Sequence, residues 1–479
     1  MLPALDGDDV PSLDPQDWQE FRKSAHRALE MIIDHIEQVR DRPVWQTMPH
    51  SVRDALREPA PRAATPLNVL LDRVAEQMLP YGGGNIHPAF CGWVQGAGTP
   101  AGLVADVLAS GMNINCGGRD HIGIALERTI TSWVAELLGF PPAASGLITS
   151  GSSMANLVGL MIARTANLGP ETRGRGLVAT RRQLVAYASE HAHGCIRRAL
   201  ELAGIGGNFL RSVPALSSGE IDVMALAEMV GRDRAEGLVP FAVCASAGTV
   251  DWGAFDDINA LADLCRAEKL WLHVDAAFGA ACAASPVLGR RLNGIEQADS
   301  VALDFHKWFH VPYDAGFLLC RHRDLHRSTF ADAQHYLSRL PRGLAAGHDW
   351  PVDYGPELSR GFRALKIWLS LQAAGLDAVG RAVEQNVALA AHFAELIESC
   401  DALERRAPVP LNIVCFGFAD RDDEAERRLV MRLHEGGLAA PSLTHVAGRE
   451  TVRCAFFNHR TKRQDVEQLY ADILAQLPD

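Results

Sequence analysis

Lysine is scarce in this sequence of 479 residues, whose positive charge is carried mainly by arginine. It occurs at five positions: Lys23, Lys269, Lys307, Lys366 and Lys462. Lys307 stands apart from the other four, which lie in helical patterns or at helix ends, because it follows a short apolar strand predicted over residues 299–303. Burial at such a strand end disfavours the charged form of an amine and favours its nucleophilic form. Such an amine can form a Schiff base with an aldehyde, although an ion-paired lysine at a strand end is the structural alternative.

The sequence also lacks the usual features of disulfide, zinc, membrane and nucleic-acid proteins. Ten cysteines occur singly, from Cys91 to Cys454, without a CxxC pair, so we expect buried, reduced thiols. Residues 1–11 are acidic without an apolar signal core, and no apolar run is long enough to span a bilayer. The formal net charge of −12, without a basic run, argues against nucleic acid or an anionic membrane as the main partner. We therefore expect a soluble cytoplasmic protein.

Strands and helices alternate through the middle of the chain. Apolar strands are predicted near residues 146–149, 184–188, 209–213, 241–245, 270–274, 301–304 and 317–320. The alternation predicts an α/β fold with a mostly parallel seven-stranded sheet and helices on both faces. Ligands of such sheets bind at the carboxyl ends of the strands.

The ends of the chain predict two further parts. Apolar residues recur at helical spacing from Trp18 to Ile36, and this amphipathic helix needs a partner surface, either in its own core or on another subunit. A long helix and a smaller α/β part with strands over 411–418 and 451–457 follow Pro356. We predict an N-terminal helical segment (1–95), a large domain (96–355) and a small C-terminal domain (356–479).

A carboxylate stands at the end of a second buried strand. Asp275 follows the strand 270–274 and precedes Ala276 and Ala277. It could pair with the nitrogen of a pyridine ring across the strand ends and keep that nitrogen protonated, which makes the ring an electron sink. Pyridoxal phosphate needs such an acid and a Schiff-base lysine, and the 32 residues between 275 and 307 leave room for one crossover. An aspartate at a strand end is alone commonplace and could cap a turn, but its combination with Lys307 is specific.

Residues 149–153 (TSGSS) join the first strand to a helix that begins near Met154. Free backbone amides, the positive end of the helix dipole and the hydroxyls of Ser152 and Ser153 make a phosphate site, although serines are also common N-caps. His191 and His193 follow the second strand. No carboxylate or cysteine set completes a metal site around them, so we predict one exposed and one functional histidine and no metal.

Residues 271–279 (WLHVDAAFG) and 304–308 (DFHKW) resemble the group II pyridoxal-phosphate-dependent amino acid decarboxylases. The aromatic-L-amino-acid, histidine and glutamate decarboxylases belong to that family, and the likeness runs from about Asp72 to the C-terminus. The resemblance implies a fold-type I pyridoxal-phosphate-dependent transferase fold. It also implies a homodimer in which the N-terminal helices wrap the other subunit, and conversion of an L-amino acid to its amine and carbon dioxide.

The resemblance assigns the central roles. Lys307 attaches the cofactor, Asp275 holds its ring nitrogen, and Ala277 is a further cofactor-binding residue. His193 matches the histidine that stacks on the pyridine ring and contacts the substrate carboxylate. Flat stacking fixes which bond at the substrate Cα lies perpendicular to the ring, and so selects decarboxylation over transamination.

The phosphate side shows one match and two departures. Ser152 and Ser153 match the phosphate-binding segment, and His306 matches a histidine beside it. Asp304 stands where the animal aromatic decarboxylases carry asparagine, so its extra charge needs a partner or a turned-away side chain. Val250 replaces a hydroxyl residue that touches the cofactor in those enzymes, and Thr249 is the candidate substitute.

The run 327–349 is typical of a mobile flap over the site. Tyr336, 29 residues after Lys307, matches the loop tyrosine that protonates the substrate carbon after carbon dioxide leaves, although a tyrosine could also simply anchor the loop. Relatives with phenylalanine there tend to run an oxygen-consuming aldehyde synthesis, so tyrosine favours simple decarboxylation.

The substrate is less defined. Trp93 matches an aromatic residue of the substrate pocket, although an aromatic in a short strand is often core. Residues 115–121 (NCGGRDH) are polar where aromatic decarboxylases present aromatic residues, so Arg119 or His121 could meet an acidic or polar substrate. We favour an aromatic amino acid. The alternatives are an acidic or polar substrate, aldehyde synthesis or carbon–carbon lyase chemistry on the same frame, and a catalytically silent pyridoxal-binding protein.

Overall fold

The structure is a computed structural model that describes residues 13–332, 338–347, 349–419 and 423–476. Seven strands form the large sheet in the order β1-β7-β6-β5-β4-β2-β3. They are β1 (Ser145–Thr149), β2 (Leu184–Ser189), β3 (Leu210–Val213), β4 (Val239–Ser246), β5 (Trp271–Asp275), β6 (Ser300–Asp304) and β7 (Gly316–Cys320). β7 runs antiparallel to its neighbours β1 and β6, and the pairs from β6 to β3 are parallel. The predicted fold class and the mostly parallel seven-stranded sheet are confirmed.

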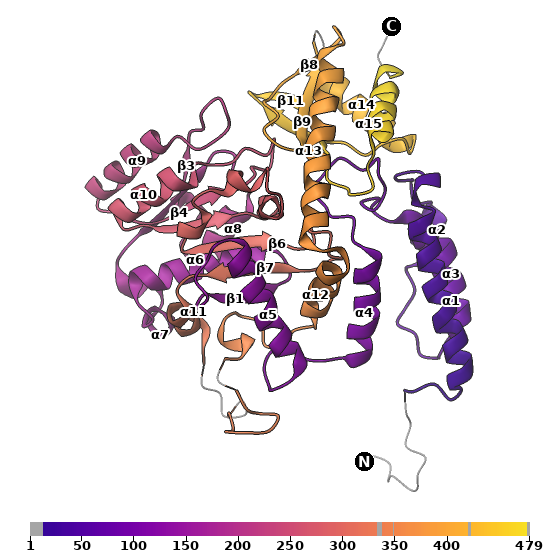
Figure 1. Cartoon of the computed structure of the whole chain (residues 1–479), viewed down its shortest axis with the longest axis horizontal. Helices are drawn as coiled ribbons and strands as arrows, with labels where there is room; N and C mark the ends of the chain where they lie inside the picture. Colours follow the sequence, from indigo (N-terminus) through magenta and orange to yellow (C-terminus); the bar gives the residue numbers. More distant parts are fainter. Residues whose placement is uncertain (1–12, 333–337, 348, 420–422, 477–479) are drawn as a thin grey trace.

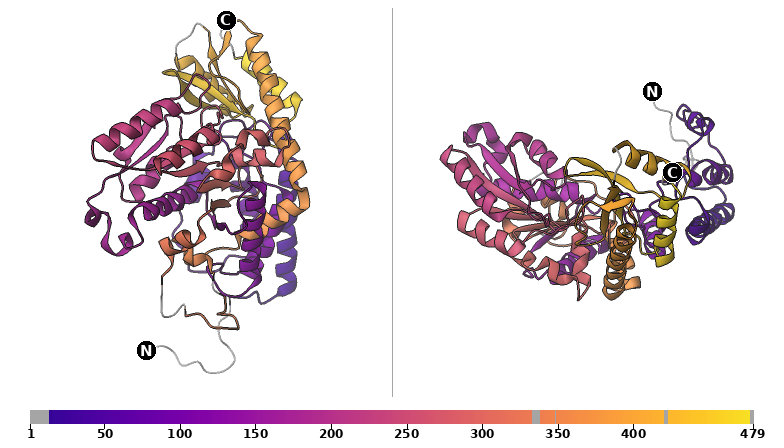
Figure 2. Two further views of the ribbon diagram at one scale, coloured as in Figure 1. Left: turned by 60° about the vertical axis from the view of Figure 1, so that its left-hand side comes forward. Right: turned by 90° about the horizontal axis from the view of Figure 1, so that it is seen from above.

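Both faces of this sheet are covered by helices (Figure 1, Figure 2). One face packs against α6 (Ser152–Leu168) and α8 (Cys195–Leu202), and the other against α5 (Ile122–Leu137), α9 (Val223–Ala235) and α10 (Ile258–Glu268). The strands β2, β5, β6 and β7 are buried at every position, because a parallel sheet between two helical layers has no solvent face. Two shorter helices, α7 (Thr172–Arg175) and α11 (Arg323–Phe330), complete this part.

The C-terminal part carries a second sheet. It contains β8 (Leu403–Arg405), β9 (Ile413–Phe418), β10 (Ser442–Val446) and β11 (Arg449–Ala455), all antiparallel, with helices α14 (Asp423–Glu435) and α15 (Arg463–Leu474). The sequence predicts only the strands at β9 and β11, because β8 has three residues and β10 is half-exposed. The division into residues 1–95, 96–355 and 356–479 stays a prediction.

One long helix joins the two sheets. α12 (Arg363–Ala374) leads into α13 (Leu376–Glu398), which rises from the large sheet to the small one (Figure 1). Asn386 of α13 accepts a 2.8 Å hydrogen bond from the indole of Trp308, next to Lys307. A Cβ at Gly380 would lie 2.2 Å from the Ala284 carbonyl oxygen, so glycine lets α13 approach the segment that follows β5.

The N-terminal helices lie along one side of the molecule. α1 (Trp18–Glu37), α2 (His50–Ala55) and α3 (Leu67–Gln77) stand outside α4 (Pro100–Met112) (Figure 1). An ion pair between Arg27 and Asp72 joins α1 to α3. Across the described residues, no helix is long and apolar enough to cross a membrane.

Candidate active site

The carboxyl ends of β5 and β6 meet at one edge of the large sheet. These strands are parallel neighbours, with Asp275 opposite Ala302 in the register. The chain leaves β6 at Asp304, whose amide donates a 3.0 Å hydrogen bond to the Ala277 carbonyl. Lys307 lies in the turn that follows. The structure thus brings Asp275, Ala277 and Lys307 to the same edge.

Lys307 reaches back to a carboxylate of its own turn. Its Nζ lies 3.1 Å from Asp304 Oδ2, and its side chain is 22% exposed while that of Asp304 is 2% exposed. The strand-end ion pair is therefore present, and the Lys307 side chain remains partly open to solvent. A lysine in this position is accessible to an aldehyde.

The Asp304 carboxylate is turned toward the start of α6. Its Oδ1 accepts a 2.6 Å hydrogen bond from the Ser152 amide, and its Oδ2 accepts a 2.7 Å hydrogen bond from the Ser152 hydroxyl. Nε2 of His306 lies 3.7 Å from the same Oδ2, while Nδ1 accepts from the Ala315 amide at 3.0 Å. Burial lowers the pKa of His306 and so favours the neutral ring. Because Nδ1 accepts from the Ala315 amide, the proton of the neutral ring lies on Nε2. A protein carboxylate thus occupies donors that would otherwise attract an anion.

Ser153 differs from Ser152. Ser153 is exposed, and neither its amide nor its hydroxyl has a hydrogen-bond partner among the described residues. Of the two serines predicted to hold a phosphate, one is engaged by Asp304 and the other is open.

Three donors surround the Asp275 carboxylate, which is 8% exposed. Asn156 Nδ2 lies 3.0 Å from Oδ2, the Ala277 amide 3.1 Å from Oδ1, and Cys195 Sγ 3.7 Å from Oδ2. Burial raises the pKa of Cys195 to about 12, so this side chain remains a thiol donor. The sequence reasoning missed Asn156 and Cys195. The available signal was that Asn156 lies one helical turn after Ser152 and so shares its face.

The two histidines after β2 have different surroundings. His193 is exposed in the turn before α8, and its Nδ1 accepts a 3.2 Å hydrogen bond from the Cys195 amide. His191 packs edge-on against Trp252, with 4.3 Å between ring centroids. Among the described residues, no group of three or more His, Cys, Asp or Glu side chains could hold a metal ion.

Thr249 closes its own turn. It is buried, its hydroxyl accepts a 3.0 Å hydrogen bond from the Ala254 amide, and its amide donates to the Ala254 carbonyl at 2.8 Å. Thr249 is predicted to contact the cofactor in place of the hydroxyl residue that Val250 replaces. This contact stays a prediction.

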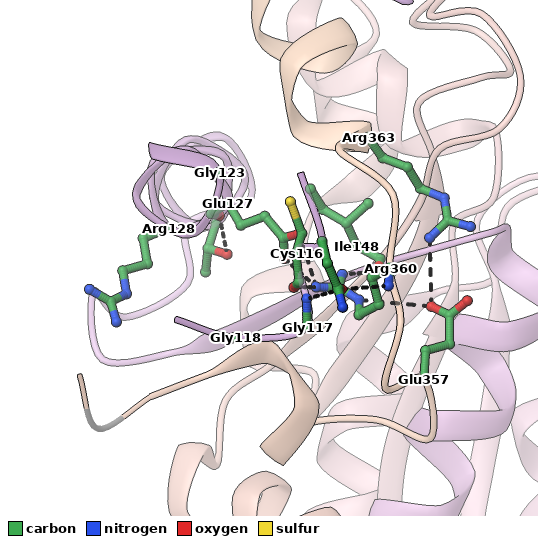
Figure 3. A network of polar contacts seen from close by, with 12 residues as sticks. Cys116, Gly117, Gly118, Gly123, Glu127, Arg128, Ile148, Glu357, Arg360 and Arg363 are labelled. Atoms are coloured by element: carbon green, nitrogen blue, oxygen red, sulfur yellow. Dashed lines mark hydrogen bonds and ion pairs between the residues drawn. The ribbon is translucent and has the colours of Figure 1, made fainter. Parts of the chain in front are cut away.

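A buried arginine holds the loop 115–121 against the sheet (Figure 3). Arg360, whose side chain is 1% exposed, contacts both carboxylate oxygens of Glu127 at 2.9 Å. It also donates to the Cys116 carbonyl at 2.8 Å and to the Ile148 carbonyl in β1 at 2.5 Å. Burial raises the pKa of Glu127, and Arg360 opposes that rise. The pair fixes the loop to the strand that precedes α6.

Both polar side chains proposed for an acidic substrate make contacts in the structure. Nε2 of His121 lies 3.1 Å from the carbonyl oxygens of Asn115 and Gly118. The guanidinium of Arg119 lies 4.9 Å from the centroid of the Trp350 ring. Backbone carbonyls thus hold the His121 ring, while ring stacking orients the Arg119 guanidinium without using its N–H donors.

Two predicted site residues remain to be placed. Trp93 is 53% exposed, with its ring centroid 6.0 Å from that of Phe90. Tyr336 lies outside the described residues. Both roles stay predictions.

The strand-end residues match the chemical groups of pyridoxal phosphate. The accessible amine of Lys307 suits its aldehyde, and the buried carboxylate of Asp275 suits its ring nitrogen. The open amide and hydroxyl of Ser153, at the start of a 17-residue helix, suit its phosphate. The segment before α6 packs closely on β7, because a Cβ at Gly316 would lie 2.4 Å from Gly151 Cα. The donor set therefore fits this cofactor.

Comparison with known proteins agrees with this chemistry. The family described as "Pyridoxal-dependent decarboxylase conserved domain" matches residues 49–419, so the chain belongs to that family. The chain is 32% identical over 471 residues to an aromatic-L-amino-acid decarboxylase of Bacillus atrophaeus, covering 95% of each chain. It is 28% identical to a phenylacetaldehyde synthase of Arabidopsis thaliana, covering 96% of each.

Solved structures show the same relationship. The crystal structure of Oryza sativa TDC with PLP and tryptamine matches with a TM-score of 0.88 and 26% identity, covering 97% of this chain and 99% of that chain. The chain is therefore a pyridoxal-phosphate-dependent amino acid decarboxylase, and the predicted family, enzyme class and cofactor are confirmed.

Proposed function

We propose that this enzyme decarboxylates an aromatic L-amino acid to its amine and carbon dioxide. The observation that carries the reaction is the convergence of Lys307 and Asp275 at the ends of adjacent parallel strands. Bound pyridoxal phosphate supplies an electron-withdrawing ring that accepts the electron pair of the breaking bond between Cα and the carboxylate. Lys307 holds the cofactor covalently, and Asp275 keeps a proton on its ring nitrogen.

The remaining predicted residues act around this pair. Ser153 donates hydrogen bonds to the phosphate from its amide and hydroxyl. Ser152 and His306 lie beside the phosphate. His193, with Nδ1 occupied by the Cys195 amide, presents an Nε2–H donor at the open side of the site. The Nε2–H group orients the substrate carboxylate, and the His193 ring covers the cofactor. Tyr336 delivers the proton that replaces the carboxylate.

The aromatic substrate is supported from two sides. Relatives are described as aromatic-L-amino-acid, tryptophan and tyrosine decarboxylases. In this chain, Arg119 and His121 are engaged by an aromatic ring and by backbone carbonyls. His121 is therefore held within the loop 115–121, and Trp93 remains exposed for contact with an aromatic side chain.

The test is a carbon dioxide release screen with the cofactor-loaded enzyme. L-tryptophan, L-tyrosine, L-phenylalanine and L-3,4-dihydroxyphenylalanine should be turned over, and L-glutamate and L-cysteine sulfinate should not. Lys307→Ala is the matched control and should abolish turnover. Faster turnover of the acidic amino acids would refute the aromatic assignment, and normal activity of Lys307→Ala would refute the role of this lysine.

Aldehyde synthesis is the second candidate, because a phenylacetaldehyde synthase is among the relatives. Tyr336 favours decarboxylation as the proton donor. An oxygen electrode should record no oxygen uptake and a peroxide assay no peroxide for the unchanged enzyme, while Tyr336→Phe should produce both. Stoichiometric peroxide from the unchanged enzyme would favour the synthase.

We also propose that the enzyme is a homodimer. α4 leaves four apolar side chains between 47% and 56% exposed: Val104, Val107, Leu108 and Met112. α1 and α3 expose further ones beside it: Trp18, Phe21, Ile33, Leu67, Val69 and Leu70. Exposed apolar side chains on three neighbouring helices are typical of a subunit interface. Light scattering should give twice the chain mass for the unchanged enzyme, and Val107→Asp should yield monomers. A single chain mass for the fully active, unchanged enzyme would refute the proposal. The cytoplasmic location stays a prediction.

A further inference from the structure

A row of polar side chains runs behind Asp275 inside the large sheet. Trp271, His273 and Asp275 alternate along β5 and therefore share one face, which α6 covers. Ser300, at the start of β6, lies opposite His273 in the register. Asn156 projects from α6. His273, Ser300 and Asn156 have no exposed surface, so every hydrogen bond among them is shielded from water.

These side chains form a continuous chain of hydrogen bonds. Trp271 Nε1 lies 2.8 Å from Ser300 Oγ, which lies 2.8 Å from His273 Nδ1. His273 Nε2 lies 2.7 Å from Asn156 Oδ1, and Asn156 Nδ2 lies 3.0 Å from Asp275 Oδ2. The chain ends at the Asp275 carboxylate, which is proposed to hold the ring nitrogen of the cofactor.

A glycine in α6, Gly159, leaves room for the His273 ring. A Cβ at Gly159 would lie 2.8 Å from His273 Cε1 and 2.9 Å from its Nδ1. Any residue other than glycine would push the ring away from Asn156, which lies on the same helix. The position of His273 is therefore defined by the packing of α6 on β5.

The direction of each hydrogen bond follows from the Asp275 end and from the neutral ring. An indole N–H can only donate, so the Ser300 oxygen accepts from Trp271, but a hydroxyl can also accept a second hydrogen bond, so this end alone does not fix the bond to His273. A carboxylate can only accept, so the Asn156 amide presents Nδ2 to Asp275 and Oδ1 to His273. Nε2 of His273 must then carry the ring proton. A neutral ring carries one proton, so Nδ1 then accepts from the Ser300 hydroxyl and each donor points toward Asp275.

The neutral form of His273 has a physical cause. Burial lowers the pKa of His273 to about 4, although the Asp275 charge opposes that shift. At neutral pH the ring thus donates from Nε2 and accepts at Nδ1, and it adds no charge to the site.

We propose that His273 and Asn156 are positioning residues that fix the Asp275 carboxylate as the acceptor for the protonated ring nitrogen of the cofactor. The inference rests on the proposed pairing of Asp275 with that nitrogen. His273 holds the Asn156 amide in one orientation, because the flipped amide would face its oxygen to the carboxylate. Asn156 in turn holds Oδ2, while the Ala277 amide holds Oδ1.

The test compares two ligands on unloaded enzyme: pyridoxal phosphate, and an analogue whose ring nitrogen is replaced by C–H. His273→Leu removes both hydrogen bonds of the ring at similar volume and should weaken pyridoxal phosphate binding about tenfold. Binding of the analogue should change by less than about twofold, because the analogue has no ring nitrogen for Asp275 to hold. His273→Gln, which can donate to Asn156 and accept from Ser300, should restore near-normal affinity.

Asn156→Ala cuts the same chain on the helix side and should reproduce the selective loss, so the test does not depend on the folding of one variant. Urea unfolding confirms that each protein is folded. Equal losses for both ligands, or no loss with either, would overturn the positioning role.

Asp275→Asn separates this inference from the proposed function beneath it. If Asp275→Asn keeps the normal preference for pyridoxal phosphate over the analogue, the pairing of Asp275 with the ring nitrogen is wrong. If it loses that preference while the His273 and Asn156 variants keep it, the pairing stands and the positioning role is wrong.

Discussion

Replacement of Asp304 by asparagine should have opposite effects on the unloaded protein and on cofactor binding. The side chain of Asp304, which is 2% exposed, accepts from the Ser152 amide and hydroxyl and lies 3.1 Å from Lys307 Nζ. At an effective dielectric constant of about 20, the attraction across that distance is about 5 kcal/mol, most of which desolvation offsets. Asp304→Asn should therefore lower the free energy of unfolding of the unloaded protein by about 1–3 kcal/mol.

Cofactor binding should improve in the same variant. A phosphate held by Ser153 brings a second anion close to the Asp304 carboxylate, and even at about 8 Å one pair of like charges costs about 2 kcal/mol at a dielectric constant of about 20. Removal of the Asp304 charge also frees the Lys307 amine. We expect the dissociation constant for pyridoxal phosphate to fall about tenfold, which corresponds to about 1.4 kcal/mol.

Two measurements check this expectation. Fluorescence titration of dialysed protein gives the dissociation constant, and urea unfolding with and without cofactor gives the two stabilities. Asp299→Asn is a matched control, because Asp299 lies at the opposite end of β6, where it accepts from the Leu272 amide; it should leave cofactor affinity unchanged. Weaker cofactor binding by Asp304→Asn would refute the view that the carboxylate competes with phosphate.

Three further variants test the packing around the site. Gly159→Ala should lower stability and also weaken cofactor binding, because its Cβ would displace His273; unchanged affinity in the variant would contradict this. Arg360→Met should cost about 3–5 kcal/mol in urea unfolding by leaving Glu127 buried and unpaired, and adding Glu127→Leu should recover part of the loss; additive losses would count against the pair. Burial lowers the pKa of His326 from 6.5 to about 4, so the unfolded chain binds more protons below pH 6.5 and this group makes stability fall as the pH drops toward 4. The stability advantage over His326→Gln should shrink by about 1.4 kcal/mol per pH unit in that window, and a constant difference would refute the assignment.

The sequence predicts the large sheet well because its strands are short, apolar runs buried on both faces, such as β5 and β6. Asp275 and Lys307 could be paired from the sequence because parallel strands end at the same edge. The direction of Asp304 could not, since its partner Ser152 lies 152 residues away.

Other parts of the site also depend on packing between distant segments. Asn156 appears in the sequence only as a polar residue inside a helix, and its role requires the approach of α6 to β5. Thr249 is the candidate substitute for the hydroxyl residue that Val250 replaces, and the sequence does not reveal that its hydroxyl closes a local turn. Short, half-exposed strands such as β10 lack the apolar run that reveals a strand.

The helix α13 connects the two sheets of the molecule. It spans 23 residues, or about 34 Å, and is held near its start by the close approach of Gly380 to Ala284. Further along, Asn386 is bonded to the residue next to Lys307. A tilt of the four-stranded sheet would therefore act through this one helix on the residue next to Lys307, so ligands that order Lys307 should also restrict the motion of the four-stranded sheet.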